Sequence, residues 1–164
     1  MSGRSSRVLV TGATGLAGSH TVRALLDAGH RVRAFVRSPE KARRVFDGQD
    51  GPLETAQGDI GDVSSVREAL RGCDGVVHCA AVVAVDLGNT PEALIETIET
   101  NVAGVRNVVG TAVEQGLERI LHVSSLATLF RGGTFGSCKR RVIPSRSSTR
   151  ARSSHRTIRA SPSR

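Results

Sequence analysis

The feature that most constrains the fold is a glycine-rich turn near the start of the chain. The apolar run Val8-Leu9-Val10 is followed at once by T-G-A-T-G-L-A-G, residues 11–18, and then by a helical pattern. A buried strand, a tight turn and a helix in immediate succession are typical of phosphate sites in parallel α/β sheets. The unpaired N–H groups and partial positive charge of a helix N-terminus attract an anion such as a dinucleotide pyrophosphate.

Each glycine of this turn has an expected role. Gly12 permits the sharp turn, Gly15 leaves room for the phosphates, and Gly18 lets the helix pack closely on the strand. The spacing is G-x-x-G-x-x-G rather than G-x-G-x-x-G, so a plain strand–helix turn is the alternative for this motif alone. The remaining residues of the turn that we expect to line a cofactor are Ala13, Thr14 and Leu16.

Apolar periodicity predicts alternating strands and helices over residues 7–124. Strands are predicted at 7–10, 31–36, 53–57, 75–81 and 119–124, and helices at 16–28, 39–46, 63–71 and 91–115, with Ser38 and Asp62 as N-caps. This alternation implies crossover connections and a parallel sheet. We therefore expect an α/β fold of the Rossmann type, a doubly wound parallel sheet of order 3-2-1-4-5 that is incomplete at its C-terminal half.

The distribution of charge divides the chain into two parts. The formal net charge is +8, but residues 1–133 hold 14 Lys and Arg against 15 Asp and Glu, whereas residues 134–164 hold nine Lys and Arg, eight Ser and no acid. The last segment cannot bury enough apolar surface to offset its conformational entropy. We predict a dinucleotide-binding domain over residues 1–132 and a basic, disordered, Ser/Arg-rich tail over residues 133–164.

The composition also narrows the class of protein. No stretch approaches the ~18 to 20 apolar residues of a membrane span, and residues 1–7 do not form a signal peptide, so we expect no membrane partner and a cytoplasmic location. Cys73, Cys79 and Cys138 lack the spacing of a metal site, and no metal is expected. The basic tail could attract phosphates, but no aromatic platform accompanies it, and we expect no specific nucleic-acid partner.

Further candidate residues lie on or directly after the second, third and fourth predicted strands. Arg37, with Arg33 on the same strand, suits a 2′-phosphate and favours NADP over NAD, with a solvated arginine as the alternative. Asp59 could accept the adenine amino group while Ile60 packs on the ring, although an Asp there is often a turn residue. His78 lies in an apolar run and is expected in the core rather than as an acid or base.

Small and polar residues complete the pattern. Ala80 and Ala81 end the fourth predicted strand, where small side chains let a cofactor lie across the sheet edge. Asn101 is unfavourable within a helix, which suggests a polar role such as anchoring backbone or a water molecule. Ser124 and Ser125 end the fifth predicted strand at the same ligand-binding edge.

In this order and at these spacings, T-G-A-T-G-L-A-G, G-D-I, H-C-A-A, N-V-A-G-V-R-N-V and H-V-S-S resemble the extended short-chain dehydrogenases/reductases. This family includes NAD-dependent epimerases/dehydratases, dihydroflavonol reductases and 3β-hydroxysteroid dehydrogenases. The resemblance covers residues 6 to about 130. It implies a Rossmann fold that holds NADP or NAD, with Asn101 as the structural residue of its helix.

The resemblance also assigns roles to the other candidates. The three glycines of the turn would contact the pyrophosphate, and Asp59 and Ile60 would hold adenine. Ala80 and Ala81 would line the nicotinamide ribose. Ser125 would be the catalytic serine that hydrogen-bonds the substrate oxygen, with the preceding serine as the alternative if the register slips by one.

The chain departs from this family in its proton donor. The family's chemistry uses a tyrosine whose pKa is lowered by a lysine four residues later. The sequence has no tyrosine, and its only lysines are Lys41 and Lys139. We expect a catalytically incomplete portion of an epimerase, dehydratase or reductase, with a non-catalytic dinucleotide-binding module as the alternative. A small-molecule substrate is expected only for an intact homologue, and the family's dimerising helix, here 91–115, leaves a homodimer as an expectation.

The tail suggests a reason for this departure. A Ser- and Arg-rich run without acids that starts abruptly is typical of out-of-frame translation. Codons can be chosen for residues 148–153 such that the frame starting one base earlier, at the last base of the Ser148 codon, reads Tyr-Ala-Arg-Ser-Lys. We hypothesise that a frameshift between about residues 131 and 142 replaced the catalytic half. The nucleotide sequence of the gene tests this, and the hypothesis fails if no shifted frame continues the family pattern.

Overall fold

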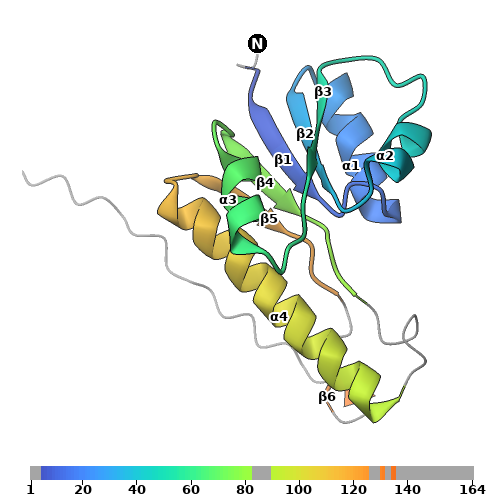
Figure 1. Cartoon of the computed structure of the whole chain (residues 1–164), viewed down its shortest axis with the longest axis vertical. Coiled ribbons are helices and arrows are strands. Elements are labelled where there is room, and N and C mark those ends of the chain that lie inside the picture. Colours follow the sequence, from blue (N-terminus) through green and yellow to red (C-terminus); the bar gives the residue numbers. More distant parts are fainter. Residues whose placement is uncertain (1–4, 83–89, 126–129, 132–133, 136–164) are drawn as a thin grey trace, which may run out of the picture. The chain divides into compact units, whose positions relative to one another are not determined.

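The computed structural model describes residues 5–82, 90–125, 130–131 and 134–135. Its contacts divide the chain into two units, Met1–Ser124 and Ser125–Arg164. The first unit contains a five-stranded sheet with the order β3-β2-β1-β4-β5, in which all neighbouring strands are parallel (Figure 1). The expected strand order and the α/β Rossmann-type fold are confirmed.

Strands and helices alternate along the first unit. The elements are β1 (Arg7–Thr11), α1 (Leu16–Asp27), β2 (Arg31–Val36), α2 (Pro39–Val45), β3 (Leu53–Gln57), α3 (Val63–Leu70), β4 (Gly75–His78), α4 (Pro91–Glu114) and β5 (Arg119–His122). The last residue that the sequence predicted for each helix is its C-cap. The helix boundaries were therefore predicted to within one residue.

Two strands end earlier than the sequence predicted. β4 stops at His78 rather than at residue 81. The Cys79 N–H makes the last ladder bond, to the backbone oxygen of Thr11, and the Ala80 N–H bonds to the Thr11 hydroxyl instead of to a strand. β5 stops at His122 rather than at residue 124, because its neighbour has already ended. The bond from the Val123 N–H to the His78 oxygen is the last link between the two strands. Both segments leave the sheet at the same edge.

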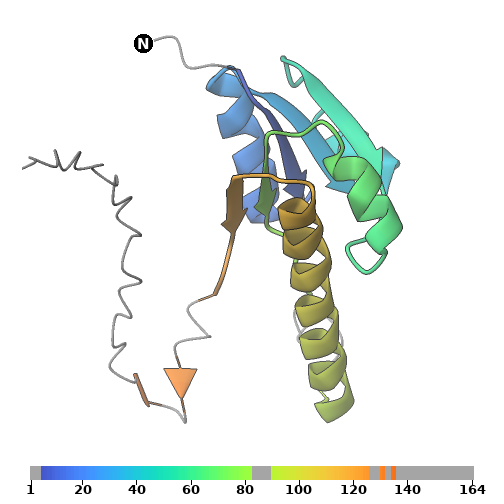
Figure 2. The same ribbon diagram turned by 90° about the vertical axis from the view of Figure 1, so that its left-hand side faces the viewer.

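The sheet separates two apolar cores. On one face, α1 and α2 pack over side chains that include Val10 and Ala34, and on the other face α3 and α4 pack over Leu9 and Phe35 (Figure 2). Successive residues of a strand point to opposite faces, which places Leu9 and Val10 in different cores. The carboxyl end of β1 is thus held between two packed layers, and the turn that follows it starts from a rigid position.

Helix α4 is longer than the sheet that it covers. Its first half extends beyond the strands (Figures 1 and 2), and Leu94, Ile95 and Ile98 on this half are about half exposed. Within the described part of the chain, no helix combines the length and the apolar character that crossing a bilayer requires.

The second unit contains a short hairpin that the sequence analysis did not predict. β6 (Phe130–Arg131) pairs antiparallel with β7 (Thr134–Phe135). Thr134 and Phe135 thus lie in a strand, within the segment that the sequence analysis predicted to be a disordered tail. The division into a domain at 1–132 and a tail at 133–164 stays a prediction. The rest of the predicted tail, residues 136–164, lies outside the described residues.

Candidate functional site at the carboxyl edge of the sheet

The glycine turn connects β1 to α1 at the carboxyl edge of the sheet, which the strand arrowheads mark in Figure 1. Gly12 has φ +64°, in the region that favours glycine, and a Cβ there would lie 2.7 Å from the Cα of Ala80. A Cβ on Gly18 would collide with the carbonyl group of Gly12. Gly12 therefore lets the turn approach the end of β4. Gly18 lets α1 pack on the turn itself, rather than on the strand as the sequence predicted.

Helix α1 begins without a side-chain cap. Its N-cap, Gly15, makes no side-chain hydrogen bond, and its first turn contains no acidic residue. In the other three described helices, Ser38, Asp62 or Thr90 accepts hydrogen bonds from N–H groups of the first turn. The N–H donors of α1 and its partial positive charge are therefore open to an external anion. Leu16, the first residue of the helix, is 83% exposed beside them.

The turn after β4 is held from two sides. The hydroxyl of Thr11 accepts a hydrogen bond from the Ala80 N–H at 3.3 Å and lies 2.6 Å from Nδ1 of His78. The Asn101 side-chain amide accepts from the Val82 N–H and donates to the Val82 oxygen, each at 2.8 Å. Asn101 thus anchors backbone, one of the two roles predicted for it, and both its polar atoms are engaged there. Ala80 and Ala81 lie between these anchors.

His78 is a core residue, as the sequence predicted. It is 1% exposed, and its ring stacks on that of His122 with centroids 5.2 Å apart. Burial, and to a smaller extent the neighbouring His122, lowers the pKa of His78 to about 4. The imidazole is therefore neutral near pH 7, which fits a structural role.

The G-D-I segment follows β3 and is fastened to α4. Asp59 is exposed, and its Oδ1 accepts a hydrogen bond from the Gly61 N–H at 2.7 Å. Ile60 is half-buried and packs against α4, where Gly104 leaves room for its side chain. The carboxylate of Asp59 is therefore at the surface of the carboxyl edge, whereas much of the Ile60 side chain already contacts the protein.

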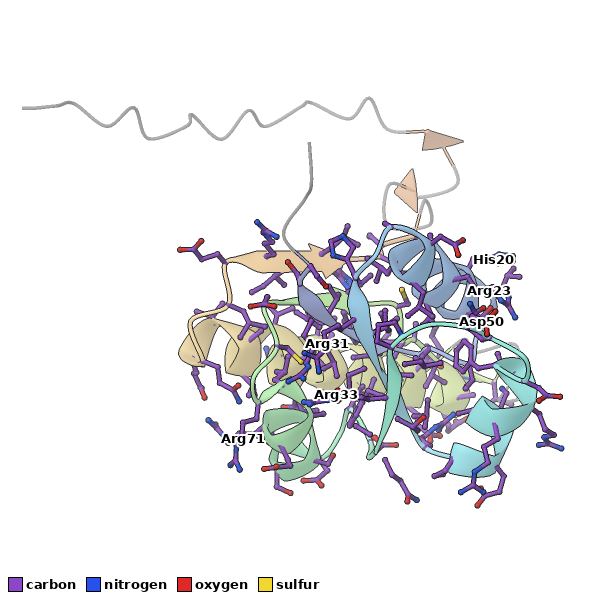
Figure 3. The ribbon with its side chains drawn as sticks, turned by 90° about the horizontal axis from the view of Figure 1, so that it is seen from above. His20, Arg23, Arg31, Arg33, Asp50 and Arg71 are labelled. Atoms are coloured by element: carbon purple, nitrogen blue, oxygen red, sulfur yellow. The ribbon has the colours of Figure 1, made fainter. Side chains whose placement is uncertain are left out.

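The two candidate arginines, Arg33 on β2 and Arg37 directly after it, have different surroundings. Arg37 directly follows the strand, is exposed, and pairs with no carboxylate of the described residues. Arg33, whose side chain is 16% exposed, pairs with Glu54 at 3.0 Å and donates to the carbonyl oxygens of Ala69 and Arg71, on the side of α3 (Figure 3). Arg33 is engaged within the protein, so only Arg37 is placed to meet a 2′-phosphate.

Two residues with clear roles were not singled out from the sequence. Asn107 donates to the oxygens of Ile60 and Gly61 at 2.8 and 3.2 Å and so ties the G-D-I turn to α4. Thr11 entered only as the first residue of the glycine motif, yet its hydroxyl links the turns after β1 and β4. Asn107 could have been found by the same signal as Asn101, since both are helix-unfavourable residues within N-V-A-G-V-R-N-V.

Ser125, the predicted catalytic serine, is exposed and is the first residue of the second unit. The alternative, Ser124, is exposed and is the last residue of the first unit. The catalytic role of either serine stays a prediction. Among the residues that the structure describes, no three His, Cys, Asp or Glu side chains gather as metal ligands would, and Cys73 and Cys79 are half-buried thiols without a disulfide.

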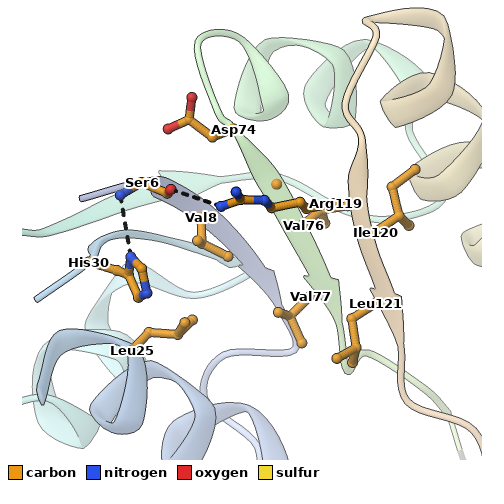
Figure 4. A pocket seen from close by; sticks show the side chains of 11 residues that line it. Ser6, Val8, Leu25, His30, Asp74, Val76, Val77, Arg119, Ile120 and Leu121 are labelled. Carbon is orange, nitrogen blue, oxygen red and sulfur yellow. Dashed lines mark hydrogen bonds between the residues drawn. The ribbon is translucent and has the colours of Figure 1, made fainter. Parts of the chain in front are cut away.

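A separate hollow of about 300 Å³ lies on the sheet near the amino ends of β4 and β5 (Figure 4). Val8, Val77 and Leu121 form part of its apolar lining, and the Arg119 guanidinium donates to the Ser6 hydroxyl at its rim. The glycine turn lies at the opposite edge of the sheet. Because the turn presents open N–H donors, it is the better candidate site for an anionic ligand.

Known proteins match most of this chain. The model of the NAD dependent epimerase/dehydratase family matches residues 8–153. Cinnamoyl-CoA reductase 1 from Petunia hybrida is 36% identical over 127 residues, which cover 75% of this chain and 36% of that protein. Sterol demethylase protein B from Methylococcus capsulatus is 39% identical over 122 residues, which cover 74% of this chain and 35% of that protein. The chain thus spans about a third of the length of the curated relatives it matches.

Solved structures show the same relationship. UDP-glucose 4-epimerase from Bifidobacterium longum, in complex with NAD+ and UDP, has a TM-score of 0.64 and 27% identity, covering 74% of this chain and 37% of its own. The family match reaches residue 153, further along the chain than the motifs quoted from the sequence. The sheet order, the glycine turn and these matches agree: the chain belongs to the NAD-dependent epimerase/dehydratase family.

Proposed function

We propose that this chain binds a nicotinamide dinucleotide across the carboxyl edge of its sheet. The observation that carries the proposal is the uncapped N-terminus of α1, whose donors face no side chain of their own. The pyrophosphate would lie on the turn from Gly12 to Gly18, against the N–H groups that begin the helix. Ala13, Thr14 and the exposed Leu16 would line the same turn. The UDP-glucose 4-epimerase relative, which was solved with NAD+, supports this assignment.

The two ends of the dinucleotide would extend in opposite directions from the turn. The adenosine half would lie toward β2 and β3, where Asp59 presents a carboxylate oxygen at the surface and part of Ile60 remains accessible. The nicotinamide half would lie toward β4, where Ala80 and Ala81 leave the edge uncrowded. The nicotinamide ring supplies hydride exchange when the dinucleotide is bound. The chain's own residues bind and orient it, and Asn101 holds the turn beside it through the backbone of Val82.

Arg37 supports a preference for NADP over NAD. Its guanidinium is exposed directly after β2, and a planar group with several N–H donors binds phosphate in two contacts. We expect Arg37→Ala to weaken NADPH binding about tenfold and to leave NADH binding within about twofold, since one charged hydrogen bond is worth ~1.5 kcal/mol or more. Arg44→Ala removes another exposed arginine, in α2, and is the matched control. Equal losses for both cofactors would remove the preference.

Fluorescence titration of the purified chain with NADH and NADPH tests the binding proposal directly. Saturable binding of at least one cofactor, competed by its oxidised form, is the expected result. A flat titration with protein whose circular dichroism shows a folded α/β unit would overturn the proposal.

We further propose that the chain does not turn over substrate by itself. The family's proton donor is a tyrosine, and none of the 164 residues is a tyrosine. Ser125 would contact the substrate oxygen but has no acidic proton to give at neutral pH. Consumption of NADPH by the purified chain with cinnamoyl-CoA or a dihydroflavonol would contradict this proposal. Reduction of NADP+ or NAD+ by the chain with a 3β-hydroxysteroid would contradict it equally.

The first half of α4 supports the expected homodimer. Leu94, Ile95, Ile98 and Val102 are all 44 to 57% exposed, and spacings of three and four place most of them along one stripe of the helix. Sedimentation velocity over a range of concentrations checks this, because a dimer that uses the stripe dissociates when Ile98 is replaced by Lys.

A further inference from the structure

The hydroxyl of Thr11 lies between two turns of the carboxyl edge. Thr11 is the last residue of β1 and directly precedes the glycine turn. Its Oγ1 accepts the Ala80 N–H at 3.3 Å, and its backbone oxygen accepts the Cys79 N–H at 3.3 Å. The position of this one side chain therefore relates the glycine turn to the turn after β4.

The third contact of this hydroxyl is with His78. Oγ1 lies 2.6 Å from Nδ1 of the imidazole, and both residues are buried, at 0 and 1% exposure. A backbone N–H can only donate, so the bond from Ala80 uses a lone pair of Oγ1 and leaves the hydroxyl proton for another acceptor. Nδ1 is the acceptor at hydrogen-bond distance. This arrangement requires the tautomer of His78 in which Nδ1 carries no proton and Nε2 is protonated.

The opposite arrangement satisfies fewer groups. If Nδ1 carried a proton, Oγ1 would accept from both His78 and Ala80, and its own proton would have no acceptor among the contacts of the described residues. Nε2 of His78 is buried and has no hydrogen-bond partner among the described residues in either arrangement. Burying an imidazole with one unpaired nitrogen is unfavourable in free energy. Any role of His78 at this position therefore depends on the contact that Nδ1 makes with Thr11.

We propose that His78 is a positioning residue of the dinucleotide site: by accepting a hydrogen bond from the Thr11 hydroxyl, it orients the oxygen lone pair that accepts the Ala80 N–H. The inference rests on the proposed dinucleotide function, because the two turns fixed in this way are those that would enclose the pyrophosphate and the nicotinamide ribose. His122, the register partner of His78 on β5, stacks on the ring and limits its rotation.

Paired substitutions separate this role from simple core filling. His78→Leu keeps much of the buried volume but removes the acceptor, whereas His78→Asn places an amide oxygen near the position of Nδ1. Thr11→Val removes the hydroxyl at constant shape, and Thr11→Ser keeps it. We expect His78→Leu and Thr11→Val each to weaken NADPH or NADH binding about tenfold, and the Asn and Ser variants to stay within about threefold of the natural chain.

The double variant Thr11→Val/His78→Leu tests whether the two residues act through one bond. If they do, it binds the cofactor no more than about threefold more weakly than either single variant, because the second change removes nothing further. Losses that multiply, or a folded His78→Leu variant that binds as the natural chain does, would overturn the proposal.

A measurement without ligand distinguishes failure of this inference from failure of the proposed function. In the natural chain, ¹⁵N NMR should show an unprotonated Nδ1 of His78. The Ala80 amide should exchange with solvent at least tenfold faster in His78→Leu than in His78→Asn, while the Val10 amide, within the sheet, stays unchanged. A protonated Nδ1 or an unchanged Ala80 exchange rate would overturn the inference. A natural chain that shows the expected NMR pattern but binds neither cofactor would overturn only the proposed function.

Discussion

Helices α1 and α3 both begin at the carboxyl edge of the sheet, but their N-termini are satisfied in opposite ways. At α3, the Asp62 carboxylate accepts from the N–H groups of Ser64 and Ser65, and bonds from the Ser64 hydroxyl and N–H hold the pKa of Asp62 below its usual value. At α1, Gly15 offers no side chain. The N–H donors of α3 are therefore satisfied within the protein, whereas those of α1 stay open to an external anion, as the proposed dinucleotide site requires.

Gly18→Ala, at the uncapped N-terminus of α1, should reduce cofactor affinity the most. Its Cβ would meet the Gly12 carbonyl group, so the turn has to shift away from the helix. We expect cofactor affinity to fall on the order of a hundredfold, as overpacking of about 2 to 3 kcal/mol implies, with a lower melting temperature. Gly110→Ala, in α4 with open space around the added Cβ, is the control and should stabilise the protein slightly. Calorimetric titration measures both.

Gly15→Asp converts the open helix end into one that resembles α3. The new carboxylate should cap α1 and repel the pyrophosphate, so we expect affinity to fall at least about tenfold while the melting temperature changes by less than ~2 °C. Gly15→Asn supplies a cap without the charge and should bind with intermediate affinity. If Gly15→Asp binds the cofactor normally, the α1 terminus is not the phosphate site.

Lowering the pH should reduce the stability that His78 and the Asp62 cap of α3 contribute, each in a different pH range. The pKa of His78, which contacts Thr11 before the glycine turn, is lowered from 6.5 to about 4 in the folded chain. As the pH falls, the imidazole is therefore protonated in the unfolded chain before it is protonated in the folded chain. Stability should fall as the pH drops from 6.5 toward 4, by on the order of 1 to 3 kcal/mol. The lowered pKa of Asp62 means that its contribution is present above 3.8 and is lost only below that pH. Urea unfolding from pH 7.5 to 4.5 isolates the His78 effect, and His78→Asn should flatten it.

Of the four changes considered, Asp62→Ala should have the smallest effect on cofactor affinity. It removes the cap of α3, and we expect the melting temperature to fall by about 2 to 5 °C while cofactor affinity stays within about twofold. Thermal unfolding followed by circular dichroism, with the same NADPH titration, measures both. A large loss of affinity would show that the closed end also takes part in binding.

Local signals were predictable from the sequence. The caps Ser38 and Asp62 were found because a cap depends on residues within three positions of it. The strand order followed from the alternation of elements, and the glycine turn from its position after a buried strand. Asn101 was recognised as an unfavourable helix residue, and its bonds to Val82 bear out the expectation that it anchors backbone.

Partners distant in sequence were not predictable. After the last ladder bond of β4, the Ala80 N–H is taken by the hydroxyl of Thr11, which is 69 residues away, and no local pattern shows this. Arg33 and Arg37 look equivalent in the sequence, but Arg33 lies opposite Glu54 in the register of β2 with β3 and pairs with it. Ile60 looked free to contact a ring until the packing of α4 placed Gly104 against it.

The outer side of β5 has a practical consequence for every measurement above. β5 is an edge strand of the described sheet. Leu121 on it is 53% exposed, and Val123, directly after it, is 43% exposed. Edge strands with unpaired backbone groups and apolar side chains act as templates on which another chain can add a strand. Concentrated samples should therefore associate through β5. Dilute protein with light-scattering control is the condition in which affinities and melting temperatures report on single molecules.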